Sequence, residues 1–146
     1  MNFAGTYQIK APREQVFDFI TDPNKIGRCF PDLKSLDMEG EDKFTAVVRV
    51  GVGFIKGDFK FRIAVVEKDP PARVRLKGTG TGSGSNVDLD TAIELADVPE
   101  GTKLDYKADV KLAGVIVGLA QRVIGSTTEK TVNELFARVR NELEKQ

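Results

Sequence analysis

Apolar and polar residues alternate with a period of two between positions 33 and 111, which is typical of β-strands that bury one face. The connections between the alternating stretches are short and carry turn residues, among them Asp69-Pro70-Pro71 and Gly82-Ser83-Gly84. Strands that follow one another through such connections form an antiparallel meander. The pattern predicts six strands, at residues 33–39, 43–53, 55–67, 72–80, 85–96 and 102–111.

The two ends of the chain have different patterns. Residues 2–10 alternate and predict a first strand, and Pro12 favours the start of a short helix. Asp22-Pro23 predicts a second short helix, which must end before Pro31. Apolar residues and threonines at three-to-four spacing then predict one long helix over 114–144. Together these elements predict a single α+β domain over residues 1–146, with a seven-stranded, curved antiparallel sheet around the C-terminal helix.

One face of this predicted sheet is free of charge. In the strands between 43 and 111, the alternate positions that hold the apolar residues contain no charged residue. The positions between them carry Lys, Arg and Asp residues. An antiparallel sheet with one buried and one solvated face has this pattern. If residue 81 pairs with 84 across the Gly82-Ser83 turn, Lys77 lies opposite Asp88 and Arg75 lies opposite Asp90.

The uncharged face is either a filled core or a chamber for a ligand, and patterning alone leaves both open. Glycine weakens a strand unless something must approach it closely, which favours a chamber. A few hydroxyls in an apolar concavity are also typical of a small-molecule site, although a threonine on a helix can bond its own backbone instead. The residues concerned are Gly57, Gly78, Gly80, Thr91, Tyr106, Thr127, Thr128 and Thr131.

The turns at the two ends of the meander differ in composition. Turns 39–43, 67–71 and 97–101 are rich in acidic residues, whereas Lys56 is the only charge in 51–57, 79–86 and 112–118. An exposed apolar cluster marks an entry mouth, a membrane contact or a protein interface. Alternatively, residues 115–117 fold over the core and leave Phe54 and Ile55 exposed. Without a basic cluster, any membrane contact is expected to be shallow and reversible.

Composition excludes several kinds of chemistry. Lys plus Arg and Asp plus Glu both total 22, so the basic excess of a nucleic-acid-binding protein is missing. The chain has no histidine and one cysteine, Cys29, so an internal disulfide, a thiolate metal cluster and the commonest general base are excluded. Cys29 is interpreted as a small buried apolar residue. The N-terminus lacks a signal-peptide pattern and no apolar run is long enough to cross a bilayer, so we expect a cytoplasmic protein.

Several segments resemble a known family. Residues 9–17 (IKAPREQVF) with Asp22-Pro23 resemble the start of the polyketide-cyclase/START-like (SRPBCC) superfamily, which has the helix-grip fold. Segments 51–57, 69–71, 78–84, 101–106 and 118–124 resemble the CoxG family of carbon monoxide dehydrogenase subunits, although that family usually has glycine where Asp32 stands. The resemblance implies an accessory protein that recruits a molybdenum-containing carbon monoxide dehydrogenase to the inner face of the cell membrane. It also implies a site for a lipophilic quinone.

The leading hypothesis is therefore a non-catalytic protein that binds a hydrophobic, quinone-like molecule. The alternatives are a polyketide cyclase or dehydratase, for which Tyr106 is the one inward proton donor, and an interaction domain with a filled core. No catalytic residue, metal site or cofactor is expected. The predicted ligand-binding residues are Val48, Val50, Phe59, Phe61, Ile63, Leu76, Gly78, Leu89, Thr91, Tyr106, Ala108, Val110, Leu119, Val123 and Thr127. The predicted mouth or membrane-contact residues are Phe30, Phe54, Ile55, Val115 and Ile116.

Overall fold

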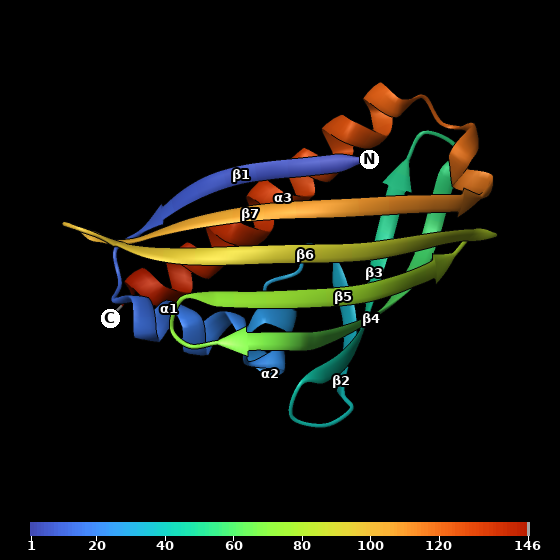
Figure 1. Ribbon diagram of the computed structural model, residues 1–146. Helices are drawn as coiled ribbons and strands as arrows, with labels where there is room; N and C mark the ends of the chain where they lie inside the picture. The colour runs from blue at the N-terminus through green and yellow to red at the C-terminus, as the bar shows by residue number, and fades with distance from the viewer. Residues whose placement is uncertain (146) are drawn as a thin grey trace.

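A single antiparallel sheet forms the framework of the protein in the computed structural model, which describes residues 1–145 (Figure 1). The strand order is β1-β7-β6-β5-β4-β3-β2, so β1 pairs with the last strand, β7, and β2 lies at the opposite edge of the sheet. The predicted α+β architecture is confirmed. The strands are β1 (Asn2–Ile9), β2 (Leu33–Met38), β3 (Lys43–Val52), β4 (Ile55–Asp69), β5 (Arg73–Gly82), β6 (Ser85–Val98) and β7 (Gly101–Gly114).

Two short helices, α1 (Arg13–Ile20) and α2 (Pro23–Gly27), connect β1 to β2, as the sequence predicts. The carboxylate of Asp22 accepts hydrogen bonds from the backbone N–H groups of Asn24 and Lys25, at 3.0 and 3.3 Å. This is a side-chain cap that satisfies donors left free at the start of a helix. A buried face of α1 contacts β6 and β7, so this end of the sheet is covered.

The C-terminal helix begins later than predicted. Residues Val115–Gly118 form a short 3-10 helix, η1, and α3 extends over Gln121–Glu144 after an extended link. The reason lies at Gly114, whose φ of +85° is unfavourable for other residues and whose added Cβ would clash with the carbonyl oxygen of Gly84. The Ser85 hydroxyl also accepts a hydrogen bond from the N–H of Ile116 at 2.9 Å. These contacts hold 114–116 against the β5–β6 turn.

The register between β5 and β6 differs from the prediction. Gly82 pairs with Ser85, so Lys77 lies opposite Asp90 and Arg75 opposite Ala92. Both central turn residues, Ser83 and Gly84, have positive φ, which is the tight hairpin turn that matches strand twist. The shift is two residues, so every side chain keeps its predicted face.

Arg75 and Asp90 still meet, diagonally rather than directly. The guanidinium donates two hydrogen bonds to the carboxylate, Nη2 to Oδ2 at 2.7 Å and Nε to Oδ1 at 2.9 Å. This bidentate contact holds the pKa of the Asp90 carboxyl below its usual value.

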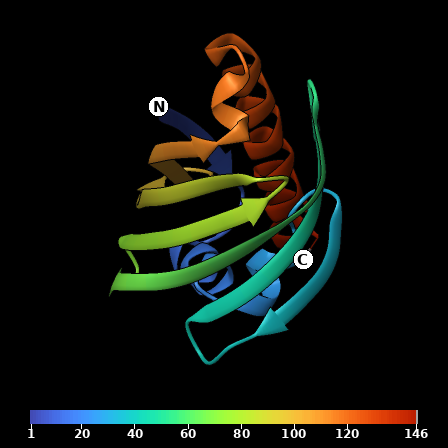
Figure 2. The ribbon, with the colours of Figure 1, turned by 90° about the vertical axis from the view of Figure 1, so that its right-hand side faces the viewer.

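The sheet curls so that its inner face surrounds α3, as the side view shows (Figure 2). On α3, Phe136, Val139 and Leu143 are buried in the core shared with the sheet and α1, and Ile124 is also buried. Just before β2 the chain turns at Asp32, whose φ is +57°. Aspartate tolerates this left-handed conformation better than most residues, which explains how it can stand where the resembling family has glycine.

Candidate functional site

The middle of the inner sheet face is partly open to solvent. Val65, Leu76, Thr91 and Ala108 are paired directly across β4, β5, β6 and β7, and each is only half-buried. We call these four residues the middle row. Apolar residues in the centre of a filled core are almost fully buried, so solvent reaches this part of the inner face.

The neighbouring row on the same face is closed. Val74, Ile93 and Tyr106 pair across β5, β6 and β7 and keep 3, 4 and 7% of their surface exposed. These residues, which we call the closed row, lie toward the end of the sheet that α1 and the C-terminal half of α3 cover. The half-buried middle row therefore begins where the helical cover ends.

Helix α3 spans the centre of the sheet rather than packing directly on it. Within the sheet its closest backbone approaches are to β1 and β3, which lie toward opposite edges. Val123 and Thr127 of α3 are half-buried, like the middle row. Thr131 is exposed, and its hydroxyl donates a hydrogen bond to the carbonyl of Thr127 at 2.9 Å, so its hydrogen-bonding capacity is used within its own helix. Of the two hydroxyls, that of Thr127 is the better candidate for contact with a ligand.

Aromatic rings occupy the space that the β5 glycines leave. A Cβ on Gly80 would clash with the ring of Phe61, and a Cβ on Gly82 would lie 2.7 Å from Cδ1 of Phe59. Rings from β4 thus lie over the backbone of β5, a known way to compensate for glycine in a strand. These glycines accommodate the chain's own side chains and are not by themselves evidence for a ligand.

An aromatic stack that sequence reasoning missed forms one wall of the inner face. The ring of Phe136 on α3 stacks against the rings of Tyr7 and Tyr106, with centroid distances of 4.7 and 5.7 Å. The Tyr7 hydroxyl donates a hydrogen bond to Oδ1 of Asn133. Burial raises the pKa of both tyrosines, so both remain protonated donors at neutral pH. The alternation of residues 2–10 places Tyr7 on the inner face and is the one signal that would have found it.

The structure places the predicted ligand-binding residues on the inner face of the sheet, on the facing side of α3, or beside η1. Their role in ligand binding stays a prediction. Val48, Phe59, Ile63, Tyr106 and Val110 are buried. The half-buried members are Val50, Phe61, Leu76, Gly78, Leu89, Thr91, Ala108, Leu119, Val123 and Thr127.

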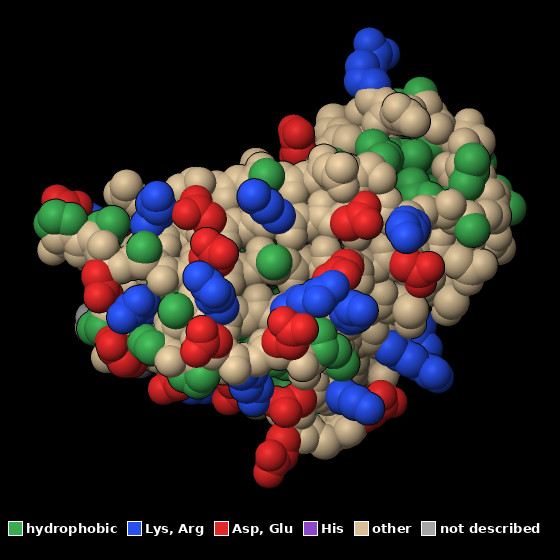
Figure 3. Space-filling view, viewed as in Figure 1, with side chains coloured by type: hydrophobic (Ala, Val, Ile, Leu, Met, Phe, Trp, Pro, Cys, Tyr) green, Lys and Arg blue, Asp and Glu red, His purple; other side chains and the backbone are tan. Residues whose placement is uncertain are grey.

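The predicted mouth is only partly as expected. Phe54, Val115 and Val117 are exposed by 62, 51 and 59%, and we call these three residues the apolar end. Ile55 and Ile116 are buried, contrary to the prediction. Ile55 follows the β3–β4 turn at a strand position that faces inward, and the side chain of Ile116 in η1 packs into the core. Apolar side chains gather at this end of the molecule in the space-filling view (Figure 3).

Contacts between η1 and two hairpin turns bring the apolar end together. A Cβ on Gly118 would lie 3.3 Å from the Phe54 ring, and a Cβ on Gly84 would lie 3.1 Å from Val115. Leu119 packs even more closely on Gly53, at 2.7 Å from the position of an added Cβ. The β3–β4 turn, the β5–β6 turn and η1 therefore form one continuous surface.

Phe30 does not belong to this surface. Its ring centroid lies 6.1 Å from that of Phe44, which is near the start of β3, whereas Phe54 follows the end of that strand. At about 3.3 Å per residue, the length of β3 separates the two rings. The prediction grouped them because the sequence does not show which end of the sheet the segment after α2 approaches.

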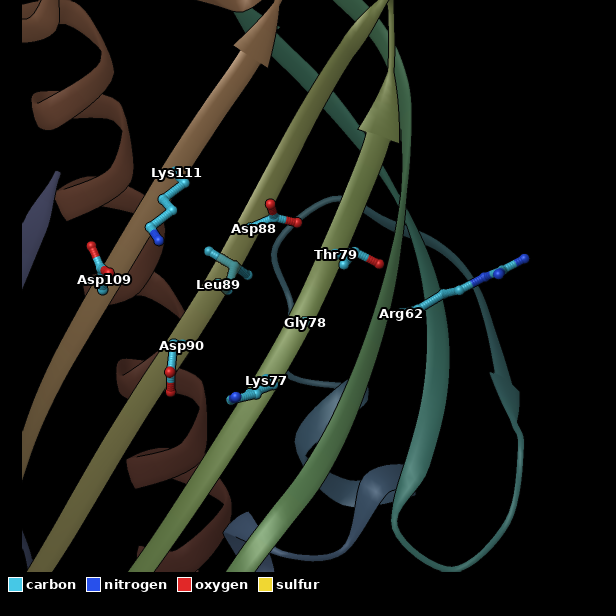
Figure 4. A pocket seen from close by; sticks show the side chains of 9 residues that line it. All are labelled: Arg62, Lys77, Gly78, Thr79, Asp88, Leu89, Asp90, Asp109 and Lys111. Carbon is cyan, nitrogen blue, oxygen red and sulfur yellow. The ribbon is translucent and has the colours of Figure 1, made fainter.

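A hollow of about 390 Å³ lies on the outer face of the sheet, where β5, β6 and β7 run side by side (Figure 4). Lysines and aspartates surround it, including Lys77, Asp88, Asp109 and Lys111. Lys77 lies opposite Asp90 and Asp88 lies opposite Lys111, so opposite charges on adjacent strands compensate one another, although Asp109 lies opposite Asp90. The hollow thus has the character of a solvated sheet face.

The fold and the inner face define a START-like helix-grip domain. The chain belongs to the CoxG family of carbon monoxide dehydrogenase subunits, whose model matches residues 5–144. None of the curated proteins matches the chain. Among residues 1–145, no helix combines the length and the apolar character that crossing a membrane requires.

Solved structures support the same fold. A conserved protein from Geobacillus kaustophilus is 27% identical, with a TM-score of 0.91 over 99% of this chain and 96% of that one. A START superfamily protein from Mycobacterium smegmatis has a TM-score of 0.74 at 12% identity, covering 99% of this chain and 97% of its own. DynU16, a protein in the dynemicin biosynthetic locus, has a TM-score of 0.61 at 19% identity, over 98% of this chain and 47% of that one.

Proposed function

We propose that the protein binds a lipophilic, quinone-like molecule between the inner sheet face and α3, and that it serves as a non-catalytic accessory protein. The observation that carries this proposal is the half-buried middle row. Apolar side chains that are folded toward a helix yet remain partly exposed gain free energy when a ligand covers them, at about 25 cal/mol for each Å². A filled core offers no such gain.

The polar groups near the middle row suit a quinone. Its rings and prenyl chain would lie against Leu76, Leu89 and Ala108, which carry no charge. The hydroxyl of Thr127 or Tyr106 would donate a hydrogen bond to a quinone carbonyl. A mainly apolar concavity with one or two donors is the usual composition of a small-molecule site. The apolar end would form the mouth and make at most peripheral contact with a membrane.

Two observations support an accessory role over catalysis. The chain has no histidine, and the inward positions of β3 to β7 carry no carboxylate or ammonium apart from Lys68 and Asp97, which are exposed at strand ends beyond the closed row. A cyclase needs a proton shuttle, and general acids and bases are mostly drawn from those groups. Membership of the CoxG family supports a partner of the molybdenum-containing carbon monoxide dehydrogenase type, which the protein would serve at the inner face of the cell membrane.

Tyrosine fluorescence provides a direct test. Tyr7 and Tyr106 are the only two tyrosines, the chain has no tryptophan, and their rings stack side by side, 6.2 Å between centroids. A naphthoquinone carrying one prenyl unit would quench this emission saturably if it binds at the inner face. Quenching that rises linearly without saturation would mean collisions in solution, and the proposal would fail.

A matched pair of variants locates the site. Ala108→Phe fills the middle row and should weaken binding of the prenylated naphthoquinone by about tenfold, which is 1.4 kcal/mol. Ala92→Phe makes the same change on the outer face of the neighbouring strand, where the side chain is exposed, and should leave binding unchanged. Equal weakening in both variants would place the ligand elsewhere.

A further inference from the structure

A second pocket lies outside the proposed quinone site. It has a volume of about 420 Å³ and is formed by α1, α2 and the C-terminal part of α3. Figure 1 shows α1 beside the C-terminal end of α3, and the two helices are in contact. None of the residues that line the pocket belongs to the middle row. Its size falls within the range of small-molecule sites.

Cationic side chains surround this pocket. Lys25 and Arg28 come from α2 and its C-terminal cap, and Arg138 and Lys145 come from α3 and its C-terminal cap. One carboxylate, that of Glu142, lies among them and is already paired with Lys145 at 2.9 Å. We call this the basic pocket. In a chain whose charges balance, such a local excess of positive charge sets up a field that attracts anions.

Spacing and hydrogen bonds keep the cationic groups in place. Residues 138, 141, 142 and 145 recur at three-to-four spacing, so they share one face of α3. Arg138 donates from Nη1 to the carbonyl of Phe30 at 3.3 Å, and Arg28 donates from Nε to Oδ1 of Asn24 at 3.0 Å. Each guanidinium has five N–H donors, so most remain free for another acceptor.

The floor of the basic pocket is apolar. Phe19 is half-buried there, and Cys29 is buried with its Sγ 3.5 Å from the carbonyl of Lys25. Burial raises the pKa of the Cys29 thiol, Glu142 adds to that rise, and Arg138 opposes it. The sulfur is therefore a neutral thiol at pH 7 and belongs to the apolar surface.

We propose that the basic pocket binds a small amphiphilic anion, with a phosphate or carboxylate held by the cationic rim and an apolar part resting on Phe19 and Cys29. Guanidinium groups suit these anions because they donate parallel N–H bonds. The pocket is separate from the middle row. Failure of this inference would leave the quinone proposal untouched, and the reverse also holds.

The test follows backbone amide NMR shifts of α2 and the end of α3 during titration with phenyl phosphate. We expect saturable shifts confined to the basic pocket, tighter binding than for inorganic phosphate, and weaker binding as salt is raised. Shifts that spread over the surface without saturating would overturn the inference. So would saturation by an acidic peptide but not by phenyl phosphate, because the pocket would then be a protein docking surface.

A charge-matched pair of double variants provides the control. Lys25→Gln with Arg28→Gln removes two cations from the rim and should weaken phenyl phosphate binding by about fivefold. Arg122→Gln with Lys130→Gln removes one lysine and one arginine from exposed positions of α3 outside the pocket and should have no effect. Equal weakening in both would show attraction to overall charge alone and would contradict the inference.

Vesicles distinguish the source of the anion. Pocket shifts with phosphatidylglycerol vesicles, absent with phosphatidylcholine vesicles, would place the anionic group on a lipid. Shifts with phenyl phosphate and none with either vesicle would place it on a free molecule. Both results support an anion site, and a pocket that responds to neither probe overturns it.

Discussion

The closed row and the middle row lie next to each other on the same sheet face, yet solvent reaches only one of them. Both alternate with charged outer residues in the same strands, and both are made of uncharged side chains. The difference is what covers them. The closed row lies toward the end that α1 and the C-terminal half of α3 cover. Over the middle row, by contrast, the closest backbone approaches of α3 are to β1 and β3, which lie toward opposite sheet edges.

This comparison shows that alternation reports which face is turned away from solvent, and not how completely that face is filled. Coverage depends on helices that pack from distant parts of the chain. A row that is turned inward but incompletely covered is where a ligand can replace the missing contacts.

The largest effect should come from truncating the covered part of the face. Leu104 on β7 lies one inward position beyond Tyr106 of the closed row and is fully buried. Leu104→Ala should lower the free energy of unfolding by about 3 kcal/mol, since a deeply buried leucine leaves a cavity that neighbours cannot fill. Urea unfolding measures this value. A loss below about 1 kcal/mol would show that this part of the face is loosely packed as well, and the contrast between the rows would disappear.

A smaller stability effect with a binding defect is expected in the middle row. Leu76→Ala should cost about 1 kcal/mol, because the side chain is already partly exposed. It should also weaken binding of the prenylated naphthoquinone, measured by tyrosine quenching. Leu104→Ala serves as the control, since it should destabilise the protein with little change in affinity. The opposite result, with Leu76→Ala the more destabilising and affinity unchanged, would mean that the middle row is ordinary core.

The smallest effect is expected on the outer face. The contact with Arg75 lowers the pKa of Asp90 in the folded protein. A lowered folded pKa stabilises the fold above the unfolded pKa, and this contribution is lost as pH falls below about 4. Asp90→Asn should therefore reduce stability slightly at pH 7 and converge with the natural sequence at strongly acidic pH. Thermal unfolding across pH measures this difference, and a gap that persists at strongly acidic pH would show that another contact of Asp90 is responsible.

Much of the fold follows from local patterns. The strands, the two short helices, the Asp22 cap and the uncharged inner face are all visible in the sequence, because each depends on neighbouring residues. The start of α3 was wrong because the apolar spacing continues through 114–120 while Gly114 is held against Gly84. The β5–β6 register was wrong by two residues because the turn is centred on Ser83-Gly84 rather than Gly82-Ser83.

The candidate site was less predictable. Periodicity placed Leu76, Thr91 and Ala108 on the inner face, but it could not show that solvent still reaches them. It also missed the stacking of Tyr7 on Phe136 and the basic pocket, because both join segments more than a hundred residues apart.

The sequence by itself determined the strands, their inward faces and the absence of charge along those faces, since side-chain alternation is a property of each strand alone. Only the tertiary structure decided which part of the inner face is covered, which apolar residues reach the surface, and which cations surround one pocket. Those outcomes depend on where α1, α2, η1 and α3 pack, and their packing is set by contacts that no single stretch of the chain contains.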